Sequence, residues 1–172
     1  MNHSESPITD QEFALFQKLI YKLAGISLSD AKRVLLVGRL GRRLAHYKFD
    51  TYSQYYRLVS SGQHPDELQQ MIDLLTTNET YFFREEAHFD FLTRTIVANH
   101  PSGSPFNVWS AASSTGEEIY TISFVLADTL GIDAQWSVTG SDISTAVLGT
   151  AERGLYWLDR TRGGLDAPTR SF

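Results

Sequence analysis

The chain has 172 residues, of which 42% are hydrophobic and 20% are charged, a composition typical of a soluble globular protein with a core. It contains no cysteine, which excludes disulfides and thiolate metal sites within these residues. The formal net charge of −5 argues against a protein whose whole surface binds nucleic acid. The sequence shows neither a signal-peptide pattern nor an apolar run of membrane-spanning length, so we expect a cytoplasmic protein without direct membrane insertion.

Four helices are predicted before residue 76. Their start and stop signals predict one from Thr9 or Asp10 to Gly25, one from Ser29 or Asp30 to Tyr47, one from Asp50 or Thr51 to Gly62, and one from Pro65 to Leu75. Together they predict a small helical bundle that would be only marginally stable alone.

Basic residues cluster on the second predicted helix, namely Lys32, Arg33, Arg39, Arg42 and Arg43. The helical period predicts that Val34, Val37, Gly41 and Leu44 line the buried side, with Lys32, Arg39 and Arg43 nearly opposite and Arg42 beside them. From the residues alone, this surface is either a solvated face or a site for a specific anionic partner.

The stretch Thr76 to Phe89 (TTNETYFFREEAHF) separates the helical region from a differently patterned one. It is interpreted either as a linker that runs into a helix or as part of a site, because it combines polar, aromatic and charged residues. A helix is predicted from Glu85 to Ile96. His88 lacks a second histidine at ligand spacing and is not expected to bind a metal.

After the composition break at residues 99–105, the pattern changes to alternating strand and helix. Phe106 to Ala112 and Ala134 to Gly140 are predicted strands, and helices are predicted from Ile119 to Leu130 and from Ser144 to Arg153. This order is that of a nucleotide-type βαβ unit, in which Asp142 follows the second strand.

The loop from Ser113 to Glu118 contains a single glycine and lacks the lysine of a phosphate-binding loop. Its two acids would repel phosphates, which favours a ligand with a ribose and a cation, such as S-adenosylmethionine. Glu117 and Glu118 can also be read simply as favourable acids in the first turn of a helix.

Four segments resemble the CheR family of chemotaxis receptor methyltransferases. They are KRVLLVGRLGRRL, LTTNETYFFREEAHF, WSAASSTGEEIYTIS and SDISTAVLGTAERGLY, in that order, and the resemblance extends from about Phe13 to Tyr156. It implies an α/β protein with a small N-terminal all-α domain, followed by a truncated Rossmann-like S-adenosylmethionine-dependent methyltransferase domain. The expected ranges are 8–75 for the receptor-facing helical domain, 76–104 for a linker and connecting helix, and 105–172 for the incomplete methyltransferase domain.

The resemblance also implies roles for individual residues. Asn78, Thr80, Arg84, Glu118 and Asp142 match positions that bind S-adenosylmethionine, with Asp142 assigned to the ribose and Arg84 also near the transferred methyl. Arg39, Arg42 and Arg43 match basic positions of the helix that faces the receptor. The implied reaction is methyl transfer to receptor glutamates, with S-adenosylhomocysteine as product and the cytoplasmic domain of methyl-accepting chemotaxis receptors as partner.

The expected chemistry requires little from the protein beyond positioning. A glutamate carboxylate with a pKa of about 4.3 is ionised at neutral pH, so no general base is needed. We expect Arg84 to be held partly by its own neighbours, for example Glu85 or Glu86.

Residues after Tyr156 are predicted to be irregular, and a fold of this type needs about seven strands, so we expect an N-terminal part of the enzyme. The alternative is a non-catalytic receptor- or cofactor-binding module.

Overall fold

The computed structural model of the chain describes residues 8–156. The chain forms two compact units that divide between Thr77 and Asn78, and each unit is described separately. The predicted irregular tail after Tyr156, and with it the end of the expected second domain, lies outside the described residues.

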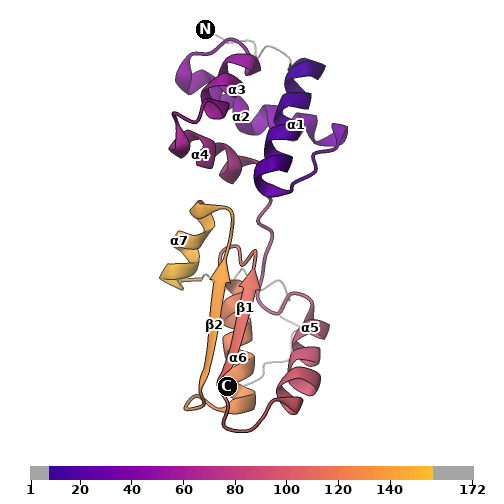
Figure 1. The fold of residues 1–172 in the computed structure, drawn as a ribbon, viewed down its shortest axis with the longest axis vertical. Coiled ribbons are helices and arrows are strands. Elements are labelled where there is room, and N and C mark those ends of the chain that lie inside the picture. Colours follow the sequence, from indigo (N-terminus) through magenta and orange to yellow (C-terminus); the bar gives the residue numbers. More distant parts are fainter. Residues whose placement is uncertain (1–7, 157–172) are drawn as a thin grey trace. The chain divides into compact units, whose positions relative to one another are not determined.

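The first unit contains four α-helices, as the sequence predicts. They are α1 (Asp10–Ala24), α2 (Arg33–Tyr47), α3 (Tyr52–Ser60) and α4 (Pro65–Leu75), and a 3₁₀ turn, η1 (Asp30–Lys32), precedes α2 (Figure 1). The predicted start and stop signals are confirmed, because Thr9 and Thr51 cap α1 and α3 and Gly25 ends α1 in the left-handed conformation.

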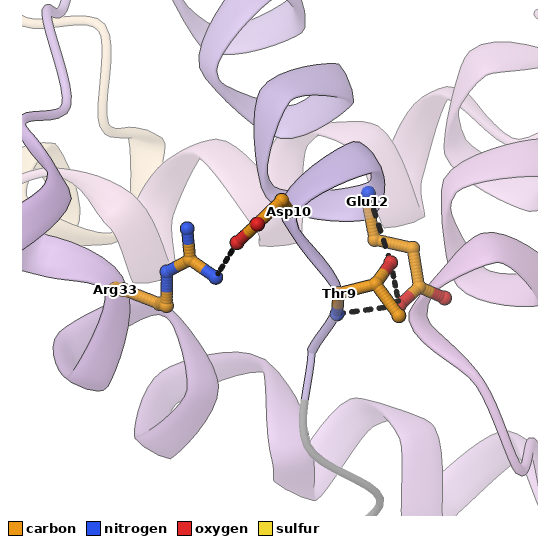
Figure 2. A network of polar contacts seen from close by, with 4 residues as sticks. All are labelled: Thr9, Asp10, Glu12 and Arg33. Carbon is orange, nitrogen blue, oxygen red and sulfur yellow. Dashed lines mark hydrogen bonds and ion pairs between the residues drawn. The ribbon is translucent and has the colours of Figure 1, made fainter.

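A network of polar contacts fixes the start of α1 (Figure 2). The Thr9 N–H and hydroxyl donate to Glu12 Oε2 at 3.0 and 2.9 Å, and the Glu12 N–H donates back to Thr9 Oγ1 at 3.2 Å. Beside this capping box, Arg33 donates to Asp10 Oδ1 at 2.7 Å, which links the first turn of α2 to that of α1.

The second oxygen of Glu12 joins α1 to α3. Glu12 Oε1 accepts from the N–H and hydroxyl of Ser53 at 2.7 and 2.9 Å, although Glu12 is only 7% exposed. Burial alone would raise the pKa of Glu12, but the hydrogen bonds from Thr9 and Ser53 outweigh it and hold the pKa below its ordinary value.

Aromatic and aliphatic side chains from all four helices fill the core of this unit, including Phe13, Phe16, Leu36, Tyr52, Tyr55 and Met71. The predicted buried side of α2 is partly wrong. Leu36, Leu40 and Leu44 are the buried residues of α2, whereas Val34 is 81% exposed. The apolar residues of α2 form two overlapping stripes, one of valines and one of leucines spaced four residues apart. The leucine stripe is the one that packs into the core of the unit.

The second unit is built on a parallel pair of strands, β1 (Phe106–Ala111) and β2 (Trp136–Ser141), whose register runs from Phe106 opposite Trp136 to Ala111 opposite Ser141. The crossover helix α6 (Glu117–Leu130) lies along one face of this sheet, and α7 (Thr145–Arg153) follows β2 (Figure 1). Val97, Phe106, Ile122 and Leu126 form its buried core. The predicted βαβ unit, and with it the α/β fold class, is confirmed.

The predicted helix from Glu85 to Ile96 is divided into two parts. It consists of α5 (Glu86–Phe91) and a π-helical segment, η2 (Leu92–Ile96), which is followed by a 3₁₀ turn, η3 (Val97–Asn99). The Thr93 hydroxyl donates to the carbonyls of Phe89 and Asp90, both at 3.1 Å, and side-chain bonds of this kind bend helices. None of the helices among residues 8–156 combines the length and apolar character needed to cross a lipid bilayer.

Candidate functional site

A pocket in the second unit lies where the chain leaves β1. It is lined by Glu79, Thr80, Tyr81, Arg84, Phe89, Ala112, Ser113, Ser114 and Glu118. Its volume is about 60 Å³, well below the roughly 300–1,000 Å³ of typical small-molecule sites, so the described residues enclose only part of a ligand of that size. The pocket therefore joins the stretch before α5 to the loop between β1 and α6.

Of the predicted cofactor-binding residues, Thr80, Arg84 and Glu118 lie together in the lining of this pocket. Asn78 lies next to it, because its carbonyl accepts from the Ser114 hydroxyl at 3.2 Å. The structure thus brings four of the five residues to one place, although they are far apart in the sequence.

Asp142, the fifth, connects the loops that follow the two strands. Its Oδ2 accepts from the Ser114 N–H at 2.8 Å and its Oδ1 accepts from the Ser144 N–H at 2.9 Å. Asp142 is half-buried and does not line the pocket. Each carboxylate oxygen can accept more than one hydrogen bond, so these contacts leave room for a ribose hydroxyl.

Arg84 sits in a turn with unusual backbone angles. Its neighbours Phe83 and Glu85 have φ of 58° and 59°, in the left-handed region that non-glycine residues rarely adopt. Arg84 Nη1 donates to the Glu79 carbonyl at 2.7 Å. Arg84 is thus held by a sequence neighbour, as expected, but the group is a backbone carbonyl five residues earlier and not the carboxylate of Glu85 or Glu86.

Thr121 on α6 anchors this turn. It is fully buried, its hydroxyl donates to the Glu117 carbonyl at 2.7 Å, and it accepts from the Phe83 N–H at 3.2 Å. Thr121 is not among the site residues predicted from the sequence. A polar residue on the buried face of a helix was the signal that could have identified it.

An aromatic cluster fixes the other side of the same stretch. The Phe82 ring lies 6.3 Å from Phe124 and 5.0 Å from Tyr156, and the Tyr156 hydroxyl donates to the Thr115 carbonyl at 2.7 Å. Tyr120 also contacts Tyr156, with ring centroids 5.5 Å apart. Phe82 is the middle one of three consecutive aromatic residues in this stretch, and its ring thus holds the pocket wall against α6.

The two acids of the loop have different environments. Glu118 is exposed, and its Oε1 accepts from the Ser110 hydroxyl at 2.7 Å. Glu117 is fully buried and accepts from the Thr115 hydroxyl. The pocket therefore combines the exposed carboxylate of Glu118 with the guanidinium of Arg84, a pairing that suits a ligand with both charges.

In the first unit, two of the predicted receptor-facing arginines make internal contacts. Arg39 Nη1 donates to the Leu74 and Thr76 carbonyls at 2.9 and 2.7 Å. It thereby provides hydrogen-bond donors to backbone carbonyls at the C-terminal end of α4. Arg42 is exposed and has no partner among residues 8–156.

Arg43 belongs to a partly buried network around Glu67. Its Nε and Nη2 donate to the two Glu67 oxygens at 2.8 and 2.5 Å, and the Tyr55 and Tyr47 hydroxyls donate to the same carboxylate at 2.7 and 3.0 Å. Burial alone would raise the pKa of Glu67, which is 6% exposed, but these hydrogen bonds outweigh it and lower the pKa. Burial, with the bond to Glu67, raises the pKa of Tyr55 well above its ordinary value.

Comparisons with known proteins match both units. The family model described as "CheR methyltransferase, SAM binding domain" matches residues 78–166, and "CheR methyltransferase, all-alpha domain" matches residues 11–76. A protein of Escherichia coli (strain K12) named "Chemotaxis protein methyltransferase" is 46% identical over 150 residues, which are 87% of this chain and 51% of that protein.

A protein of the same name from Salmonella typhimurium is 42% identical over 156 residues, 90% of this chain and 53% of the relative. "Chemotaxis protein methyltransferase 2" of Pseudomonas aeruginosa is 37% identical over 159 residues, 92% of this chain and 56% of the relative. The chain thus spans about half the length of the curated relatives it matches. Both domain matches, in the order all-α then S-adenosylmethionine-binding, show that the chain belongs to the CheR methyltransferase family.

Proposed function

We propose that this chain supplies the receptor-facing helical domain and one wall of the cofactor site of an S-adenosylmethionine-dependent protein-glutamate O-methyltransferase that acts on chemotaxis receptors in the cytoplasm. One observation carries the proposal. The pocket lined by Thr80, Arg84 and Glu118 lies inside the segment that matches the family's S-adenosylmethionine-binding domain.

The residues of the pocket fit the amino-acid end of S-adenosylmethionine, which carries an ammonium and a carboxylate. Only one oxygen of Glu118 has a partner among the described residues, and the guanidinium of Arg84 uses one nitrogen for the Glu79 carbonyl. Both charged groups are exposed and keep hydrogen-bonding capacity for a ligand. Asp142, with its capacity for further hydrogen bonds, is assigned to the ribose, and Asn78 to the edge of the site.

When bound, S-adenosylmethionine supplies a methyl group on a positively charged sulfur, which a nucleophile can attack. The receptor carboxylate is already ionised at neutral pH, so the protein's task is to orient it. Arg84 suits this task because its planar group can form two parallel hydrogen bonds with a carboxylate. The hydrogen bond from Arg84 to the Glu79 carbonyl restricts the movement of the guanidinium. This prevents an ion pair so tight that it would reduce the nucleophilicity of the receptor carboxylate.

The receptor surface is assigned to α2. Arg42 offers an exposed cation for a glutamate-rich receptor segment. Arg39 and Arg43 are included in this surface. Their hydrogen bonds to Leu74 and Glu67 fix α2 against α4 and thereby hold the helix that carries Arg42 in position. A mainly local positive charge on a chain of net charge −5 favours an acidic protein segment over a nucleic-acid backbone.

Calorimetric titration of the 172-residue chain with S-adenosylhomocysteine tests the cofactor site. We expect a dissociation constant in the micromolar range, and a clear loss of affinity in an Arg84→Ala variant. Absence of binding at about 1 mM ligand would refute the proposed site.

Retention on an immobilised receptor cytoplasmic segment, compared with an Arg42→Glu variant, tests the receptor surface. Cofactor binding without receptor retention would instead favour a cofactor-binding module.

A further inference from the structure

The turn that carries Arg84 has a backbone conformation that its own residues do not favour. The Arg84 N–H donates to the Tyr81 carbonyl at 3.3 Å and closes this turn. Its third residue, Phe83, has a φ of 58°, a value that turns usually give to glycine or asparagine. Another residue type persists in such a conformation only where the surrounding structure fixes it. Contacts from outside the turn must therefore hold it in place.

Thr121 on α6 provides such a contact. Its side chain is fully buried, and its hydroxyl accepts from the Phe83 N–H at 3.2 Å. The same hydroxyl donates its proton to the Glu117 carbonyl at 2.7 Å. Because a hydroxyl has a single proton, this second bond leaves Thr121 as an acceptor only. Thr121 is therefore a fixed acceptor for the residue that precedes Arg84.

The side chain of Phe83 constrains the turn in a more local way. It is 39% exposed, and its ring lies 6.2 Å from that of Phe89, edge to face. Phe89 belongs to α5, which directly follows the turn in the sequence. The bond to Thr121 instead connects the turn to a helix residue 38 positions away. This hydrogen bond thus ties the turn to a different element of the second unit.

The same helix carries the carboxylate of the pocket. Glu118 precedes Thr121 by three residues, which is less than one turn of α6. Arg84 and Glu118 both line the pocket, whereas Thr121 does not. Through its bond to Phe83, Thr121 connects the turn that carries the guanidinium to the part of α6 that carries the carboxylate.

We infer that Thr121 is a positioning residue, which sets the separation between the Arg84 guanidinium and the Glu118 carboxylate. The inference rests on the proposed function, since it requires a ligand that contacts Arg84. Thr121 acts on that ligand only through the turn. Without the hydroxyl, Arg84 would occupy a wider range of positions, and binding would have to order it first. The expected result is a weaker complex.

A double-mutant cycle in the 172-residue chain tests the inference. Thr121→Val keeps the shape of the side chain and removes the hydroxyl, whereas Thr121→Ser keeps the hydroxyl. In calorimetry we expect Thr121→Val to bind S-adenosylhomocysteine about fivefold more weakly, because one hydrogen bond is lost, and Thr121→Ser to bind within about twofold of the wild type. In an Arg84→Ala background no guanidinium is left to position, so Thr121→Val should change the affinity by less than about twofold.

Hydrogen exchange in the free chain provides a readout that needs no ligand. The Arg84 N–H bonds to Tyr81 and not to Thr121, so its exchange reports on the turn as a whole. We expect this amide to exchange faster in Thr121→Val. The Tyr120 N–H, which donates to the Gly116 carbonyl at 3.0 Å, is the control within α6 and should exchange as in the wild type. Unchanged exchange at Arg84 would overturn the inference.

The binding results separate the inference from the proposed function. Unchanged affinity of Thr121→Val would overturn the positioning role alone, whereas absence of binding by the wild type would overturn both. An equal loss of affinity with and without Arg84 would show a general loss of structure and overturn the positioning role. So would a Thr121→Ser variant that binds as weakly as Thr121→Val, because the hydroxyl would then not be the group that matters.

Discussion

Replacing Arg43 with alanine should destabilise the helical unit by about 3 kcal/mol. The change removes both charged donors from Glu67, which is 6% exposed and keeps only the hydroxyls of Tyr47 and Tyr55. Breaking a buried ion pair costs roughly 3–5 kcal/mol, and the lower end applies because two donors remain and the Arg43 side chain is 24% exposed. Arg42→Ala, at an exposed position, should change stability by less than about 0.5 kcal/mol.

The two units can be followed separately during urea unfolding. All three tryptophans follow residue 77, so their fluorescence reports on the second unit, while helical circular dichroism includes the first. Arg43→Ala should shift the circular dichroism transition and leave the fluorescence transition in place. A variant within about 0.5 kcal/mol of the wild type would refute the structural role of this pair. Arg43 would then be free for the receptor surface.

Three further predictions concern other positions. Glu12 has a lowered pKa in the folded state, so its contribution to the free energy of unfolding is present above about pH 4.5 and is lost as the pH falls. Glu12→Gln should therefore make the free energy of unfolding, followed by circular dichroism, depend less on pH in the acid range. Gly140→Ala should cost about 1–2 kcal/mol in urea unfolding, because its Cβ would lie 2.1 Å from Ile119 Cδ1; an unchanged midpoint would contradict this packing. Thr121→Val should speed amide exchange at Phe83, whereas Thr121→Ser should not.

Local signals in the sequence predicted much of the fold. Thr9, Thr51, Gly25 and Pro65 mark helix ends through capping, left-handed backbone and a fixed φ, and these effects act within a few residues. The parallel strand pair followed from the order of apolar runs and turns. The clustering of Thr80, Arg84 and Glu118 followed from the family resemblance.

The remaining features depend on contacts between distant residues. Nothing near Arg43 in the sequence indicates that Glu67, 24 positions later, will take its guanidinium into a tyrosine-lined site. The partner of Arg84 is a backbone carbonyl, which no side-chain pattern reveals. The hydrogen bond from the Phe83 N–H to Thr121 appears only when the surroundings of both residues are known in three dimensions.

The left-handed residues around the pocket have a consequence for comparing sequences. Phe83 and Glu85 flank Arg84, and Ala112 and Ser114 flank Ser113, all with positive φ. Glycine and asparagine accept this backbone readily, whereas β-branched residues do so only as outliers. Valine, isoleucine or threonine at any of these four positions would force the turn to change and redirect Arg84 or Ser113. Such a substitution would therefore mark family members in which this wall of the pocket has been rebuilt.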